Sequence, residues 1–143
     1  MRALFFAAAL VTTSAASAMA ETAGPFTPEQ VKAGHKTFQE WCSGCHGDNL
    51  LGGGEAPALT GAIFNQDWSK QSVGAFNAFI ANAMPQGLEG SLKPEEYAVV
   101  TAFIMAANGA KPGKTAFSGK SDVKISTIAD GKLVQSIVGA PIK

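Results

Sequence analysis

The chain has 143 residues, of which 46% are hydrophobic and 15% are charged, and its formal net charge at pH 7 is zero. This length predicts one domain with a single core. The charges are scattered as single residues, with no basic run and no basic face interleaved with aromatic residues, and this pattern excludes nucleic-acid binding as the expected function.

The first twenty residues have the three-part layout of a secretory signal peptide. Arg2 is followed by an apolar run from Ala3 to Val11 and then by the small-residue ending Ala18-Met19-Ala20. A membrane anchor is the alternative, but the run is shorter than the roughly 20 residues of a spanning helix, and no stop-transfer pattern follows. We therefore expect cleavage of residues 1–20 and a periplasmic protein without stable membrane insertion.

A first helix is predicted from Pro28 to about Cys42. Thr27 is its expected cap, Pro28 suits the first helical position, and Gln30 would complete a capping box. Residues at helical spacing form one apolar face, namely Val31, Gly34, Phe38 and Trp41.

From Gly44 to Gly61 the composition shifts to Gly, Pro, Asn and Asp, which predicts a loop wrapped over something that replaces a hydrophobic core. A short turn is expected near Asn65 to Trp68. A second helical pattern follows from about Ser72 to Ala83, with one apolar side formed by Val73, Phe76, Phe79, Ile80 and Ala83.

The last predicted helix begins at Pro94. Glu95 and Glu96 lie in its first turn, where the helix dipole favours negative charge, and Asn108-Gly109 supplies a stop. Its apolar residues are Tyr97, Val100, Phe103 and Ile104.

The composition changes again in residues 110–143, which contain one aromatic residue. Short alternating patches, such as residues 123–125 and 133–138, would pair as strands or lie extended on the surface. We find no repeat and no second domain, so the expected organisation is a signal peptide at 1–20, a domain at 21–109, and an extension at 110–143 packed on the domain or on a partner.

The run Cys42-Ser43-Gly44-Cys45-His46 is the most specific chemical signal in the sequence. In a Cys-x-x-Cys-His motif, two thiols bond to the haem vinyl groups, and the adjacent histidine binds the iron as proximal ligand. A disulfide across two residues would constrain little of the unfolded chain. A thioredoxin-like pair needs a βαβ context, and a zinc site needs more ligands than His35, the only other histidine. We predict one covalent haem c, bound through Cys42 and Cys45, with His46 on the iron.

A ligating histidine usually donates its second ring hydrogen to a carbonyl oxygen, which fixes the ring. The carbonyl of Pro57 is the candidate acceptor, because the glycines after His46 let the loop turn back. An ordinary loop proline is the alternative. Leu59 would then cover the face of the haem.

Met84 is the predicted sixth ligand of the iron. The methionines of the signal peptide leave with it, and Met105 lies inside the last predicted helix, where it is expected to pack in the core. Met84 follows the second helix, and Pro85 stiffens the loop that presents its thioether. His35 is the rival ligand; it lies off the apolar stripe and is expected to face solvent.

Residues 27–109 resemble class I cytochrome c. Gly34 and Phe38 stand eight and four residues before Cys42, as a glycine and an aromatic residue do in the first helix of that family. The resemblance implies an all-α fold of three to four helices and loops around one covalent haem, with a C-terminal extension. It also implies that Gly34 and Phe38 pack crosswise against Val100 and Phe103.

A second resemblance concerns the segment from Ala83 to Leu92, the pair Glu96-Tyr97 and the helix end from Ala106 to Gly109. All three are similar to the cytochrome domains of quinohaemoprotein alcohol dehydrogenases and to small cytochromes that serve such enzymes. Trp68 is similar in placement to family residues that approach a haem propionate, with simple rim packing as the alternative.

The expected function is one-electron transfer between Fe(III) and Fe(II), not enzymatic catalysis, because His46 and Met84 together leave no open iron position. Methionine ligation raises the reduction potential, which suits a carrier between a dehydrogenase as donor and an oxidase or other cytochrome as acceptor. Three alternatives remain: a haem enzyme such as a peroxidase, a gas sensor, and a cytochrome subunit of a dehydrogenase complex.

The signal peptide generates the first testable prediction. Replacing Ala18 and Ala20 with bulky residues should block maturation, because the cleavage site requires small side chains. Mass spectrometry of the exported protein checks this, and an unchanged mature mass would contradict cleavage after Ala20.

Overall fold

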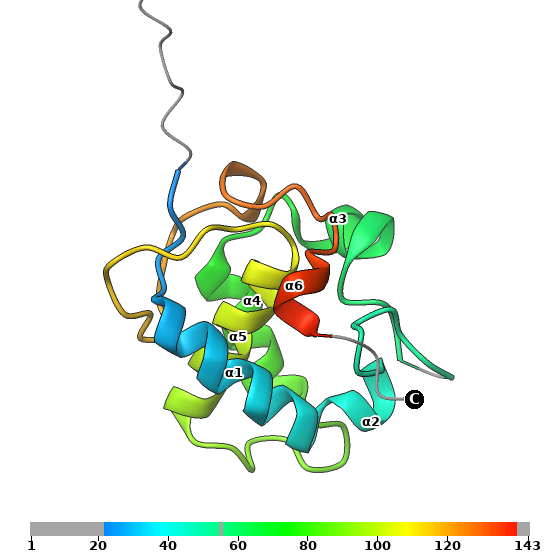
Figure 1. Cartoon of the computed structure of the whole chain (residues 1–143). Coiled ribbons are helices and arrows are strands. Elements are labelled where there is room, and N and C mark those ends of the chain that lie inside the picture. The colour runs from blue at the N-terminus through cyan, green and yellow to red at the C-terminus, as the bar shows by residue number, and fades with distance from the viewer. Residues whose placement is uncertain (1–21, 55, 140–143) are drawn as a thin grey trace, which may run out of the picture.

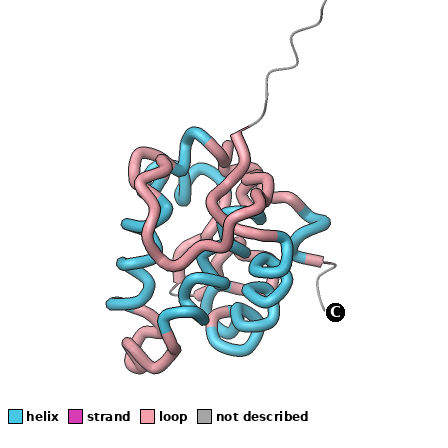
Figure 2. The backbone as a smooth tube through the Cα atoms, turned by 90° about the vertical axis from the view of Figure 1, so that its left-hand side faces the viewer, coloured by secondary structure: helices cyan, strands magenta, loops and turns pink. Residues whose placement is uncertain are grey.

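The computed structural model describes residues 22–54 and 56–139, which form helices and loops without strands (Figures 1 and 2). The predicted signal peptide lies outside the described residues. The elements in chain order are α1 Pro28–Trp41, α2 Ser43–His46, α3 Gly61–Trp68, α4 Val73–Ala83, α5 Pro94–Ala107, the 3-10 turn η1 Ile125–Thr127, and α6 Gln135–Val138. The all-α prediction is confirmed. In the described part of the chain, no helix combines the length and apolar character that a membrane span requires.

The start of α1 has the predicted capping box. The backbone N–H of Gln30 donates to the Thr27 hydroxyl oxygen at 3.4 Å, and the Thr27 N–H donates to the Gln30 side chain at 3.2 Å. These bonds satisfy two N–H groups that a helix start leaves free. The predicted stripe is buried except for Trp41, which is 40% exposed because it belongs to the last turn, at the wall of a cavity described below.

α1 crosses α5 at Gly34 (Figure 1). A Cβ atom added to Gly34 would overlap the carbonyl oxygen of Val99 and lie 2.8 Å from Cβ of Phe103. The ring centroids of Phe38 and Phe103 are 5.2 Å apart. The packing of Gly34 and Phe38 against Phe103 that the resemblance implied is confirmed, whereas the nearest backbone of α5 is that of Val99 and the contact with Val100 stays a prediction. A glycine is needed at position 34 because the two backbones touch.

Two short helices replace predicted irregular structure. α2 forms one turn inside the expected loop, and α3 has eight residues where only a turn near Asn65 to Trp68 was predicted. α3 is held by its buried Phe64, whose ring lies edge-on to Phe76 at a centroid distance of 5.6 Å. Helices this short depend on tertiary contacts more than on propensity, so the local sequence does not specify them.

Residues 110–139 lie along the helical body and form no strands, as the gold-to-red part of Figure 1 shows. Val123 and Ser121 accept hydrogen bonds from the backbone N–H groups of Val73 and Gly74, at 2.9 and 3.0 Å. One predicted patch, 123–125, is mostly extended, whereas the other contains the helical turn α6. Of the two alternatives, pairing as strands is not seen in residues 110–139, because the neighbouring elements are helices, which offer no sheet edge; the other, an extended segment, describes most of 123–125.

Gln30 also attaches the tail to α1. Its side-chain nitrogen donates to the Phe117 carbonyl at 2.8 Å, and its side-chain oxygen accepts from the Phe117 N–H at 2.8 Å. Phe117 itself is buried in the core, together with Ile125, Ile128 and Val138 of the tail. The tail therefore contributes to the same core as the helices.

Replacing Gly34 with Ala should lower the free energy of unfolding by roughly 1–3 kcal/mol, the usual cost of overpacking a close contact. Chemical denaturation of the haem-loaded protein, followed by circular dichroism, measures the effect. Gly44→Ala is the matched control, because a Cβ atom there meets no heavy atom within 4 Å. Equal stability of the two variants would show that the helix crossing tolerates a side chain.

Candidate haem site

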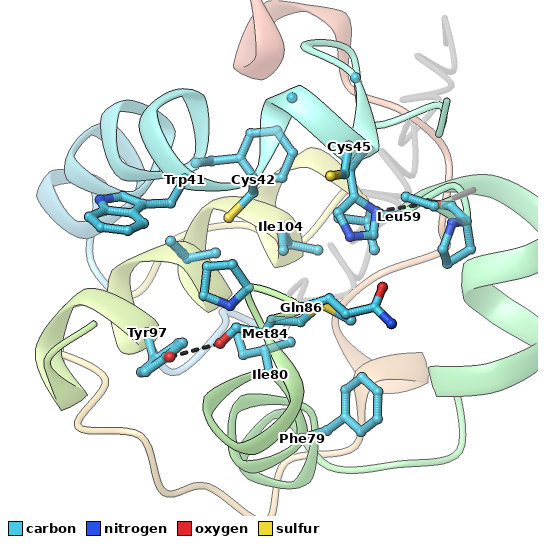
Figure 3. Close-up of a pocket in the computed structure, with 18 of the residues that line it drawn as sticks. Trp41, Cys42, Cys45, Leu59, Phe79, Ile80, Met84, Gln86, Tyr97 and Ile104 are labelled. Atoms are coloured by element: carbon cyan, nitrogen blue, oxygen red, sulfur yellow. Dashed lines mark hydrogen bonds between the residues drawn. The ribbon is translucent and has the colours of Figure 1, made fainter. Parts of the chain in front are cut away.

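A cavity of about 790 Å³ is enclosed by α1, α2, α3, α4 and α5 (Figure 3). Its walls are mostly apolar, with large side chains that include Trp41, Leu59, Phe79, Ile80 and Ile104. The volume falls within the range of small-molecule and cofactor pockets. The loop predicted to wrap over a substitute for the core, residues 44–61, supplies part of this wall.

Cys42, Cys45 and His46 are brought to the cavity by α2. The backbone N–H groups of Cys45 and His46 both donate to the Cys42 carbonyl, at 3.2 and 3.0 Å. This single turn places the three residues at positions i, i+3 and i+4, which share one helical face. Neither cysteine forms a disulfide; Cys42 is half-buried and Cys45 is exposed. The cavity therefore approaches the surface at Cys45.

The surroundings of Cys42 argue against a thiol redox pair. Burial, with a smaller contribution from the Cys45 thiol, raises the pKa of Cys42 to about 11. A redox-active Cys-x-x-Cys pair needs the opposite, a lowered thiol pKa. Zinc binding is not supported either, since the described residues contain no group of three or more His, Cys, Asp or Glu that could hold a metal ion.

His46 is buried, and its ring is fixed by the predicted partner. Nδ1 lies 2.9 Å from the carbonyl oxygen of Pro57. A carbonyl oxygen only accepts, so Nδ1 carries the hydrogen and the lone pair of Nε2 remains available for a metal. His46, Pro57 and Leu59 all line the cavity.

The segment from Pro57 to Leu59 is held by two further bonds. The Leu59 N–H donates to the carbonyl of Leu50 at 2.8 Å, and the Leu59 carbonyl accepts from Nδ2 of Asn108 at 2.8 Å. Asn108 is fully buried at the end of α5. The sequence predicts Asn108 only as part of the helix stop, because its contact with Leu59 spans 49 residues of chain.

Met84 ends α4 and lines the cavity. In Figure 3, Cys42 and Cys45 lie above the cavity and Met84 lies below it. The Met84 carbonyl accepts a hydrogen bond of 2.8 Å from the hydroxyl of Tyr97. From the sequence, Tyr97 is expected only in the apolar run of the last helix and in the second resemblance, without a role for its hydroxyl. Tyr97 is the single tyrosine of the chain, and a buried tyrosine hydroxyl usually has a partner, which is the signal that was available.

Met105 and His35, the other candidates for an iron ligand, lie outside the cavity wall. Met105 is fully buried within α5, as predicted, and does not line the cavity. His35 is also absent from the cavity wall, but the expectation that it faces solvent is wrong. Its ring is half-buried and stacks on Phe103, with centroids 4.9 Å apart and an interplanar angle of 16°.

Trp68 lines the cavity from the end of α3. Its ring lies edge-on to Phe76 at 4.8 Å and tilted against Phe79 at 4.9 Å. These contacts provide the rim packing that was the alternative reading of Trp68. An approach of Trp68 to a haem propionate remains a prediction.

The side chains of the cavity fit a covalently attached haem. Two thiols, an oriented imidazole and a thioether project from apolar walls, and these are the groups by which c-type haems are attached and ligated.

The comparisons with known proteins agree with this chemistry. Residues 29–104 match the family described as cytochrome c oxidase, cbb3-type, subunit III. The chain is 33% identical over 79 residues to the quinohemoprotein alcohol dehydrogenase ADH IIB of Pseudomonas putida. That match covers 55% of this chain but 11% of the relative, so the chain corresponds to a small part of it.

Among solved structures, a partial likeness is found to a chain in the crystal structure of the sulfane dehydrogenase SoxCD from Paracoccus pantotrophus. The TM-score is 0.45 at 19% identity, and the match covers 93% of this chain and 71% of that one. The family match spans more than half of the chain and confirms the resemblance to cytochrome c. The chain therefore belongs to the family of cytochrome c oxidase, cbb3-type, subunit III, and is a cytochrome c domain that carries covalent haem c and transfers electrons.

Proposed function

We propose that this chain is a periplasmic one-electron carrier whose haem c is attached to Cys42 and Cys45 and ligated by His46 and Met84. One observation carries the proposal. All four side chains line the same apolar cavity, although Met84 is distant in sequence from the other three. The rival ligands His35 and Met105 do not line it.

The protein's own groups would set the properties of the site. When bound, haem c supplies a one-electron couple between Fe(III) and Fe(II). The hydrogen bond from His46 to Pro57 fixes the ring and makes Nε2 a better donor. The soft Met84 thioether and the apolar walls favour the lower charge of the reduced state, which raises the reduction potential. Leu59 and Trp68, which also line the cavity, would complete the apolar walls on the two sides of the haem.

Electrons would enter and leave where the cavity approaches the surface. Cys45 is exposed, and Phe79, another wall residue, is 46% exposed. An apolar rim of this kind suits a small, transient contact with a redox partner.

A dehydrogenase is the proposed donor, and an oxidase or another cytochrome is the proposed acceptor. Support for the donor comes from the relative named as an alcohol dehydrogenase, part of which is similar to this chain. The same match supports the second candidate, a cytochrome subunit of a dehydrogenase complex. We further propose that residues 1–20 are removed on export and that residues 21–109 form the cytochrome domain, with 110–143 as its extension.

Replacing Met84 with Ala should abolish the long-wavelength sulfur-to-iron absorption band and lower the reduction potential markedly, because the thioether is lost. Visible spectroscopy and redox titration of the haem-loaded protein measure both effects. Met105→Leu is the control, since Met105 packs in the core and should leave the band intact. Persistence of the band in Met84→Ala would exclude Met84 as the ligand.

A carrier and the alternatives differ in their response to carbon monoxide. The haem-loaded protein should titrate reversibly with one electron, and its reduced form should bind carbon monoxide slowly at neutral pH, since Met84 occupies the position that the gas would need. Rapid binding would instead indicate an open iron site, as in a peroxidase or a gas sensor. Co-purification with a dehydrogenase would favour the subunit over the free carrier.

A further inference from the structure

The segment that follows α4, residues 84–91, is here called the methionine loop, and its first three residues line the cavity. Residues 86–91 are all exposed. Within the loop, the Leu88 N–H donates to the Pro85 carbonyl at 2.8 Å, and the Gly87 N–H donates to the Glu89 carboxylate at 2.8 Å. These bonds shape the loop but do not attach it to the rest of the domain.

Attachment comes from one hydroxyl group on α5. The Tyr97 O–H donates to the Met84 carbonyl at 2.8 Å (Figure 3). The same hydroxyl oxygen accepts from the Gly90 N–H at 3.1 Å. It therefore joins the two ends of the methionine loop. Apart from the bond between the Met84 N–H and Ile80 within α4, no other hydrogen bond in the described residues connects this loop to a helix.

The Tyr97 ring cannot readily move away from this position. Tyr97 is 5% exposed, lines the cavity, and stands in the first turn of α5, the helix that crosses α1. Its hydroxyl is thus presented by a buried residue of α5 to a loop whose residues 86–91 are exposed.

We propose that Tyr97 is a positioning residue for axial ligation, whose hydroxyl holds the methionine loop closed so that the Met84 thioether stays at the iron. The inference rests on the proposed assignment of Met84 as ligand. A neutral thioether competes poorly with external ligands unless its loop is preorganised. Two hydrogen bonds of ordinary net strength correspond to a change of roughly ten- to a hundredfold in the equilibrium between closed and open loop.

Tyr97→Phe keeps the ring and removes only the hydroxyl. Imidazole is the probe, added to the oxidised, haem-loaded protein, with binding followed by loss of the sulfur-to-iron band. We expect Tyr97→Phe to retain the band without imidazole and to bind imidazole roughly ten- to a hundredfold more tightly than the wild type. An affinity within twofold of the wild type would overturn the proposal.

Thr101→Val is the matched control on the same helix. It removes the buried hydrogen bond of 2.9 Å from the Thr101 hydroxyl to Asn77, which does not touch the methionine loop. Thr101→Val should lower stability but leave imidazole affinity unchanged. An equal rise in affinity in both variants would mean that general destabilisation, not the Tyr97 hydroxyl, opens the site.

The absorption spectrum of the wild type distinguishes failure of this inference from failure of the proposed function. If the wild type has no sulfur-to-iron band, the Met84 assignment fails and the role of Tyr97 fails with it. If the band is present and lost in Met84→Ala, but imidazole affinity is unaffected in Tyr97→Phe, only the inference about Tyr97 fails.

Hydrogen exchange of the wild type tests the contact without any variant. The Gly90 amide belongs to an exposed residue, yet it should exchange at least tenfold more slowly than an unstructured amide, because it donates to the buried Tyr97 oxygen. Exchange at the unstructured rate would overturn the proposal even if Tyr97→Phe fails to fold.

Discussion

The contact between Gly34 and the carbonyl oxygen of Val99 is the constraint on which the site depends. α1 and α5 can touch backbone to backbone only because Gly34 has no side chain. α1 then leads directly into the turn that carries Cys42, Cys45 and His46, with no flexible linker between them. The crossing therefore sets where the haem-attachment turn stands relative to α5, which forms another wall of the cavity.

α5 also supports two loops of the cavity wall, one that carries Met84, the proposed ligand, and one that carries Pro57, the hydrogen-bond partner of His46. Tyr97, in its first turn, bonds to the carbonyl of Met84, and Asn108, at its end, bonds to the carbonyl of Leu59, two residues beyond the acceptor of His46. Both bonds run from a side chain of the helix to a loop backbone, so they do not depend on the loop side chains. One helix thereby positions the segments on both sides of the cavity.

The features that the sequence predicts correctly are those that depend on residues close together in the chain. The start of α1 follows from Thr27 and Gln30, three residues apart, and the covalent site follows from one pentapeptide. The supporting residues were missed because their partners are distant in the chain: Asn108 contacts Leu59 across 49 residues. His35 was misread for the same reason. The period of α1 places it off the buried stripe, but the ring of Phe103 from α5 covers it.

The tail, residues 110–139, provides hydrogen bonds to the starts of two helices, which neither its composition nor its alternating patches predict. The first N–H groups of a helix have no partner within the helix. In α4, those of Val73 and Gly74 bond to tail carbonyls, and in α3 the Gly61 N–H bonds to the carbonyl of Gly131 at 2.7 Å. Thr60, the cap residue of α3, provides no side-chain bond. The tail thus caps two helices that line the cavity, and its buried residues pack in the same core as those helices.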